Sequence, residues 1–104
     1  MTSLPPPRAV VLREAEALVC GARQRDYGPP AESFGRIAAL WSAYLGRAVT
    51  PAQVAGCMAL LKIARLAYQP AHRDSAVDSC GYLALAAELA ERDAGLPAAA
   101  ALAV

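Results

Sequence analysis

The sequence predicts an all-α protein, a four-helix bundle made of antiparallel helical hairpins. Apolar residues recur three and four positions apart in four successive segments, which is the spacing of one face of an α-helix. Proline and glycine separate these segments, and no segment alternates apolar and polar residues as a half-buried strand would. Short connections make consecutive helices antiparallel neighbours.

The first two helices end at clear stop signals. A helix over residues 8–25 follows a proline-containing lead, residues 1–7, which we expect to be frayed. Gly28 and the two prolines after it end this helix. The second helix is predicted over residues 31–45, and Gly46 ends it. Its apolar stripe is the most regular in the chain and consists of Phe34, Ile37, Ala38, Trp41, Tyr44 and Leu45.

The third helix has a strong start signal. Thr50 is the expected N-cap, Pro51 occupies the first helical position, and Gln53 completes a capping box with Thr50. The helix is predicted to continue to Tyr68, because Pro70 disfavours the helical conformation in the residue before it.

The fourth helix is predicted over residues 74–93, with Gly95 and Pro97 beyond its end. One arc is apolar throughout, and the opposite arc becomes apolar further along, so we expect burial on more than one side. The helical bundle domain is therefore predicted over residues 8–95. An apolar tail over residues 96–104 either docks on a neighbouring surface or is disordered.

Composition favours a single domain that associates with itself. The chain has 104 residues, of which 57% are hydrophobic and 18% are charged, against a usual charged fraction of about 25%. So much apolar surface is hard to hide in one small chain, so we expect a homo-oligomer. The alternative is that alanine, which is only mildly apolar, inflates the count. The net charge of +1 gives no strong nucleic-acid signature, and no apolar run is long enough to cross a membrane.

The cysteines indicate a reducing compartment. Cys20, Cys57 and Cys80 are odd in number and fall within helical patterns, so we expect small buried hydrophobic side chains. No two of them form a CxxC pair, and a zinc site is not expected. The first residues do not resemble a signal peptide, so the predicted location is the cytoplasm, the host cell cytoplasm if the protein is phage-encoded.

The third predicted helix is apolar almost all the way round, which predicts burial. Only Lys62 and Arg65 interrupt it with charge, and unpaired buried charges are costly. Asp74 and Asp78 on the next helix offer partners. Counting outward from the connecting loop places Arg65 level with Asp78 and Lys62 level with Tyr82, which would allow an Arg65–Asp78 ion pair.

This cluster has the chemistry of an anion site, because arginine grips a phosphate through two donors and lysine acts as a point charge. The alternative is an ion pair internal to the hairpin. Near the end of the first helix, an aromatic ring could stack on a base, or the cations there could simply complement the helix dipole. The predicted ligand-binding residues are Lys62, Arg65, Arg25, Tyr27, His72, Arg73 and Tyr82. No catalytic motif is present.

Asp74 and Asp78, four residues apart, share one helix face and could hold a divalent cation through oxygen ligands. The alternative is that Asp74 caps the helix and Asp78 pairs with Arg65.

Several short motifs, taken in order, resemble a phage-borne family of small helical proteins of unknown function. The motifs are RDYG at 25–28, LWSAYLG at 40–46, KIARL at 62–66, HRDSAVD at 72–78 and GY at 81–82. The resemblance covers roughly residues 13–92.

The chain is more remotely similar to the MazG-like all-α nucleoside triphosphate pyrophosphohydrolases. That resemblance implies a MazG-like helical fold and magnesium held by an ExxE pair on one helix and an ExxD-type pair on a later one. Asp74 and Asp78 resemble the second pair, but Lys62 and Arg65 stand where the first would be. The resemblance therefore implies phosphate binding more strongly than hydrolysis.

These observations predict a protein that binds a phosphorylated nucleotide or a nucleotide-derived signal without hydrolysing it and without a cofactor. By analogy, a phage protein of this kind could sequester an immune signal, an anti-defence role. One alternative is a MazG-like pyrophosphohydrolase with Mg²⁺ on Asp74 and Asp78. Another is a structural or partner-binding helical module.

Overall fold

The computed structural model describes residues 3–94, and within that range all the regular structure is helical. In chain order the elements are α1 (Pro7–Ala17), the π-helix η1 (Leu18–Ala22), α2 (Arg23–Tyr27), α3 (Pro30–Leu45), α4 (Pro51–Tyr68) and α5 (Arg73–Asp93). Because α1, η1 and α2 follow one another without a break, they form the single first helix that the sequence predicts. The four predicted helices are therefore confirmed.

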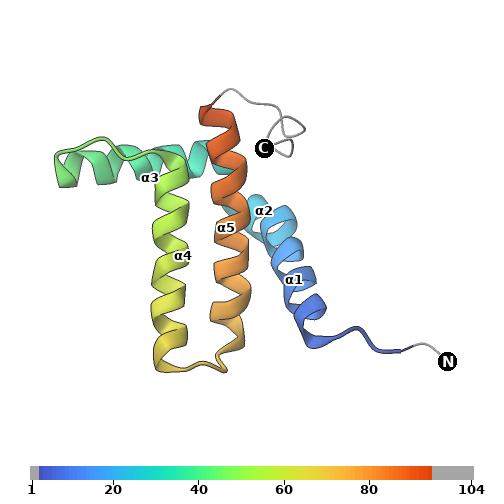
Figure 1. The fold of residues 1–104 in the computed structure, drawn as a ribbon. Helices are drawn as coiled ribbons and strands as arrows, with labels where there is room; N and C mark the ends of the chain where they lie inside the picture. Colours follow the sequence, from blue (N-terminus) through green and yellow to red (C-terminus); the bar gives the residue numbers. More distant parts are fainter. Residues whose placement is uncertain (1–2, 95–104) are drawn as a thin grey trace.

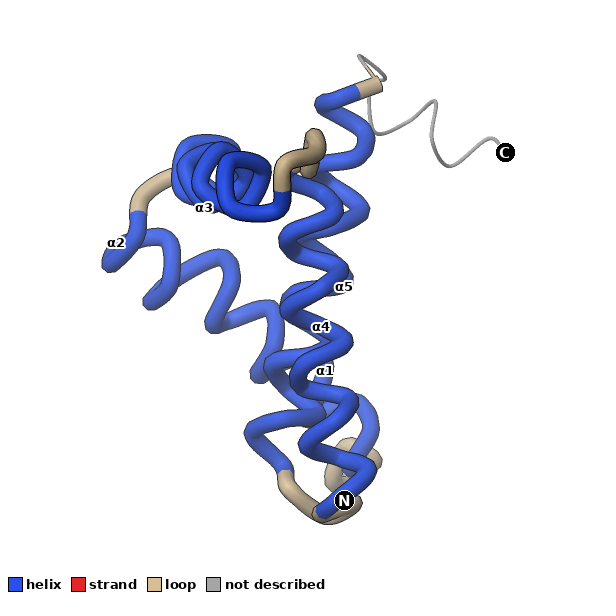
Figure 2. Tube along the Cα trace, turned by 90° about the vertical axis from the view of Figure 1, so that its left-hand side faces the viewer, coloured by secondary structure: helices blue, strands red, loops and turns tan. Residues whose placement is uncertain are grey.

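The helices do not form a regular bundle. α4 and α5 form a long antiparallel hairpin, and α1 lies beside α5 on the side away from α4 (Figure 1). α3 runs across one end of the hairpin instead of lying along it (Figures 1 and 2). The segment from α1 to α2 diverges from the hairpin and reaches α3 at its α2 end (Figure 2).

Local signals explain where the helices begin and end. Thr50 Oγ1 accepts a hydrogen bond from the Gln53 N–H at 3.1 Å, and the Thr50 N–H donates to Gln53 Oε1 at 3.0 Å. These two bonds are the predicted capping box. Gly46 ends α3 at φ 69°, and Gly28 ends α2 at φ 80°. Both angles suit glycine, which has no Cβ to clash in the left-handed region.

The main core lies where α3 crosses the hairpin. Its buried residues are Phe34, Ala38, Val54, Ala55 and Leu89, with Trp41 and Ile37 packed against them. The crossing explains why only part of the predicted α3 stripe is covered. Tyr44 and Leu45, at the end of that stripe, extend beyond the hairpin and are exposed.

Two predictions of burial are wrong for the single chain. On α4, Val54, Ala55 and Ala59 are buried, but Leu60 and Leu61 are 64% and 57% exposed. The helix packs on α5 and α3 along one side only, and nothing among the described residues covers its outer side. The cysteines are not buried either: Cys20 and Cys57 are exposed, and Cys80 is half-buried.

No helix among the described residues is long and apolar enough to cross a membrane. The predicted apolar tail, residues 96–104, lies outside the described residues.

Candidate functional site

A cleft opens between the diverging first helix, α3 and α5. It encloses about 190 Å³. Most of its wall is apolar, and its polar groups come from Arg23, Gln24, Tyr27, Ser33, Asp78 and Tyr82. A cleft with an apolar wall and a few convergent polar groups is the usual form of a small-molecule site.

The π-helix η1 shapes one wall of this cleft. The Arg23 N–H bonds to the Leu18 carbonyl, a wider turn than in an α-helix. At the same level Gly81 of α5 is buried, and a Cβ on it would lie 2.9 Å from Val19 Cγ1. Gly81 is therefore needed for the close approach of η1 and α5.

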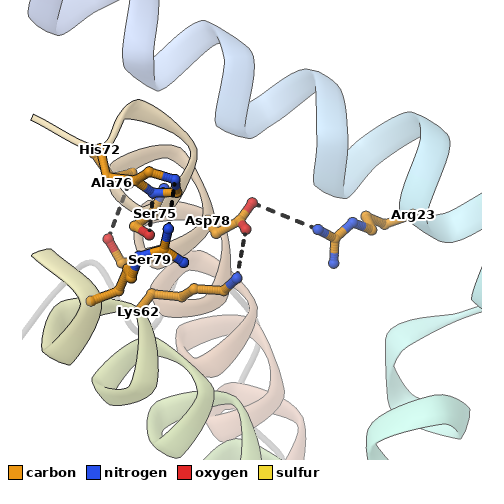
Figure 3. Close-up of polar contacts among 8 residues, drawn as sticks. Arg23, Lys62, His72, Ser75, Ala76, Asp78 and Ser79 are labelled. Atoms are coloured by element: carbon orange, nitrogen blue, oxygen red, sulfur yellow. Dashed lines mark hydrogen bonds and ion pairs between the residues drawn. The ribbon is translucent and has the colours of Figure 1, made fainter. Parts of the chain in front are cut away.

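Asp78 is the charged centre of the site. One carboxylate oxygen lies 3.0 Å from Lys62 Nζ on α4, and the other lies 3.6 Å from Arg23 Nη2 (Figure 3). Only 13% of the Asp78 side chain is exposed. A carboxylate so little hydrated needs cationic partners, and here it receives them from two different elements.

Arg23 is the cation that borders the cleft. Its pKa is raised, mainly by interaction with the Tyr82 hydroxyl, against partial desolvation, with Asp78 contributing further. The guanidinium therefore stays charged at any physiological pH. Tyr82 is oriented in turn by an edge-to-face contact with Phe34, with ring centroids 6.4 Å apart.

An ion pair between Arg65 and Asp78 is not formed. Lys62 takes that place, and the exposed Arg65 lies 3.4 Å from His72 Nε2 instead. α5 begins at Arg73, one residue before the predicted start. The partner of Asp78 on α4 lies three residues, almost one helical turn, before the expected one.

The two loop candidates make structural contacts in the described chain. His72 is the N-cap of α5, and its Nδ1 accepts a hydrogen bond from the Ser75 N–H at 3.3 Å. This corrects the expectation that Asp74 caps the helix. Arg73 pairs with Glu14 of α1 through two contacts of 2.7 and 3.1 Å. Neither residue lines the cleft.

Of the two arginines near the end of the first helix, the structure places Arg23 in the cleft and leaves Arg25 exposed outside it. Residues two apart in a helix point to nearly opposite sides, so only one of them can face α5. Arg23 lies four residues after Val19, on the same apolar face of the first helix. This spacing could have indicated that Arg23, and not Arg25, faces α5. Tyr27 does line the cleft and is 63% exposed.

The two aspartates of the predicted metal pair lie in different surroundings. Asp74 is exposed and, with Glu14 and Asp78, lines a shallow depression of about 440 Å³ next to the cleft. No group of three or more potential metal-ligating side chains is close enough to hold one ion among residues 3–94. Both oxygens of Asp78 already face cations.

The fold and the cleft define a small all-α protein with one compact pocket beside a charged triad of Lys62, Asp78 and Arg23. Residues 10–90 match the family described as "Domain of unknown function (DUF6378)", and the chain belongs to that family. The "Gene 55 protein" of Mycobacterium phage D29 is 44% identical over 72 residues, covering 69% of this chain and 48% of the relative. That of Mycobacterium phage L5 is 47% identical over 73 residues, covering 69% and 47%.

The chain thus spans about half the length of the curated phage relatives it matches. These relatives support the predicted resemblance to phage-borne proteins. No solved structure matches the chain.

Proposed function

We propose that the cleft binds a phosphorylated nucleotide or a nucleotide-derived signal and does not hydrolyse it. The observation that supports this most directly is the position of Arg23, a permanent cation at the wall of an otherwise apolar and aromatic cleft. Such a site suits a ligand with a flat, weakly polar part and an anionic part.

The size of the cleft limits what enters it. Its volume of about 190 Å³ is below the ~300 Å³ at which pockets for whole drug-sized ligands begin. A single ring system such as a nucleobase fits inside, and the rest of the ligand lies outside. Tyr27 at the exposed edge offers an aromatic face for stacking.

Arg23 is the expected phosphate contact. Its distance of 3.6 Å from Asp78 exceeds an ordinary hydrogen bond, whereas Lys62 holds the same carboxylate at 3.0 Å. A guanidinium has five donors, so Arg23 retains several for a ligand. Beyond Arg23, the depression contains the carboxylates of Glu14 and Asp74, which repel a highly charged polyphosphate. We therefore expect a ligand with few phosphate charges.

The charge balance is the reason for proposing binding without hydrolysis. Metal-assisted hydrolysis needs carboxylates available to the ion. Here Asp78 is engaged by Lys62 and Arg23, and Glu14 is engaged by Arg73. The pyrophosphohydrolase alternative would require Asp78 to release these cations to Mg²⁺. By analogy, a phage protein that binds such a ligand without hydrolysing it would sequester a host signal.

Calorimetric titration with mono-, di- and triphosphate and cyclic nucleotides tests the proposal. Arg23→Gln should weaken binding by about 10- to 150-fold, the equivalent of ~1.5–3 kcal/mol for a hydrogen bond to a charged group. Arg25→Gln is the matched control, because it changes an arginine two positions away that faces out of the cleft, and binding should be unchanged.

Two results would overturn the proposal. Binding of no nucleotide in the panel would leave the structural or partner-binding module as the better interpretation. Pyrophosphate released in the presence of Mg²⁺ or Mn²⁺, and lost in Asp78→Asn, would establish the hydrolase instead. Mass spectrometry of small molecules released by heating the protein after exposure to lysate would identify the ligand.

A further inference from the structure

The α4–α5 hairpin has one side that no other described element covers. α1 packs against α5 and α3 against α4, both on the side toward which Lys62 and Asp78 point (Figures 1 and 3). The opposite side, here called the hairpin face, is formed by Leu60, Ile63 and Ala67 of α4 and by Ala76, Leu83 and Ala87 of α5.

The residues of the hairpin face are all apolar. Its residues recur at helical spacing, three and four apart on α4 and seven and four apart on α5. Leu60, Ile63 and Leu83 are 64%, 45% and 53% exposed in the single chain. None of the six residues is charged, so the face lacks the polar cover that a solvated helix pair normally has.

The chain is also less compact than a typical domain of its length. Its radius of gyration is 15.3 Å, against about 13 Å for a compact domain of this length. Its accessible surface is 7382 Å², about 1,900 Å² above the ~5,500 Å² expected for a monomer of this mass. A standard interface removes about 800 Å² from each partner, so the excess is large enough to supply one.

We propose that a second copy of this chain packs its own hairpin face here, so that the two hairpins stack as two layers of two helices about a two-fold axis. The face is suited to itself because it carries both large residues and alanines, and a two-fold axis lets leucines of one copy lie over alanines of the other. It has no charge that would select a partner of opposite sign. The proposal goes beyond ligand binding, since the cleft lies on the other side of α5 and stays open.

Sedimentation velocity or light scattering at micromolar concentration tests the proposal. The parent protein should be dimeric. Leu83→Glu should raise the dimer dissociation constant by about 30-fold or more, as for an interface hot spot of ~2 kcal/mol. Leu12→Glu is the matched control, because Leu12 is 60% exposed but lies on α1, away from the hairpin face. That variant should remain dimeric.

A second variant guards against an effect on folding. Ala87→Arg places a long cation on the same face from an exposed position, so the fold should remain while the dimer dissociates. Circular dichroism of each variant checks helicity. A monomeric parent protein would overturn the proposal. So would a dimer that survives both Leu83→Glu and Ala87→Arg. Nucleotide titration of the monomeric variant shows separately whether the cleft binds its ligand.

Discussion

Lys62 on α4 and Asp78 on α5 form an ion pair of 3.0 Å that joins the two arms of the hairpin next to the cleft. Both side chains are largely withdrawn from water, with 27% and 13% exposure. The carboxylate also faces Arg23 from the first helix, so this one residue of α5 links three segments that are distant in sequence.

Lys62→Ala should therefore destabilise the fold more than Arg65→Ala. Loss of Lys62 leaves Asp78 with only its longer contact to Arg23, and we expect a cost of about 1–3 kcal/mol, below the ~3–5 kcal/mol for a fully buried pair. Arg65 is exposed, and its removal should cost less than ~1 kcal/mol. Chemical denaturation of both variants measures the difference. The opposite order would show that the Lys62–Asp78 contact does not hold the hairpin.

Gly81→Ala should disturb the junction of η1 and α5. Because the added Cβ would lie 2.9 Å from Val19 Cγ1, we expect overpacking to cost about 1–3 kcal/mol. Gly35→Ala is the control: nothing lies within 4 Å of a Cβ there, so it should stabilise α3 by about 0.5–1 kcal/mol. Thermal melting compares the two. If Gly81→Ala stabilised the protein as much as Gly35→Ala, η1 and α5 would not be in close contact at Gly81.

The Glu14–Arg73 pair should make the attachment of α1 sensitive to acid. The pKa of Glu14 is lowered from its ordinary value of 4.5, mainly by its hydrogen bond to Arg73. The stabilising contribution is therefore complete above pH 4.5 and is lost as the pH falls through the lower folded-state pKa. The melting temperature of Glu14→Gln should approach that of the parent protein on acidification. Because the pair is exposed, added salt should also reduce the difference at neutral pH.

Substitutions of Tyr27 should change nucleotide binding without changing the stability of the fold. Tyr27→Ala should weaken binding of the nucleotides found in the titration by about 5- to 150-fold, corresponding to ~1–3 kcal/mol for stacking on a base. Its exposure of 63% predicts little change in melting temperature. Tyr27→Phe keeps the ring and should bind like the parent protein. Unchanged affinity in Tyr27→Ala would place the ligand away from this edge.

The sequence predicts the helices well because their ends depend on nearby residues. The Thr50 capping box and the Gly46 stop act within a few positions, so the third helix begins and the second helix ends where expected. Periodicity also identifies which side of a helix is apolar. It contains no information about the direction in which that side meets a neighbour, so the crossing of α3 over the hairpin was not predictable in this way.

The site was predicted less completely, for two physical reasons. The register of the hairpin depends on the tightness of one turn, and an error of three residues exchanged Arg65 for Lys62. The cleft depends on the divergence of the first helix, and the choice between Arg23 and Arg25 follows from the direction each takes from that helix. Tyr27 was identified as an aromatic residue at the end of the first helix, and Asp78 and Tyr82 as residues of the fourth helix level with the cations of the third.

The π-helix η1 sets the direction in which the cation of the cleft points, because it takes up one extra residue. Its wide turn, closed from Arg23 to Leu18, holds one residue more than an α-helical turn would. If this stretch wound as a regular α-helix without losing a residue, everything after it would rotate by about 100° relative to α1. Arg23 and Tyr27 would then leave the cleft together. A homologue one residue shorter in this stretch should therefore wind regularly and still direct the aligned arginine into the cleft, because the shorter chain needs no π-turn.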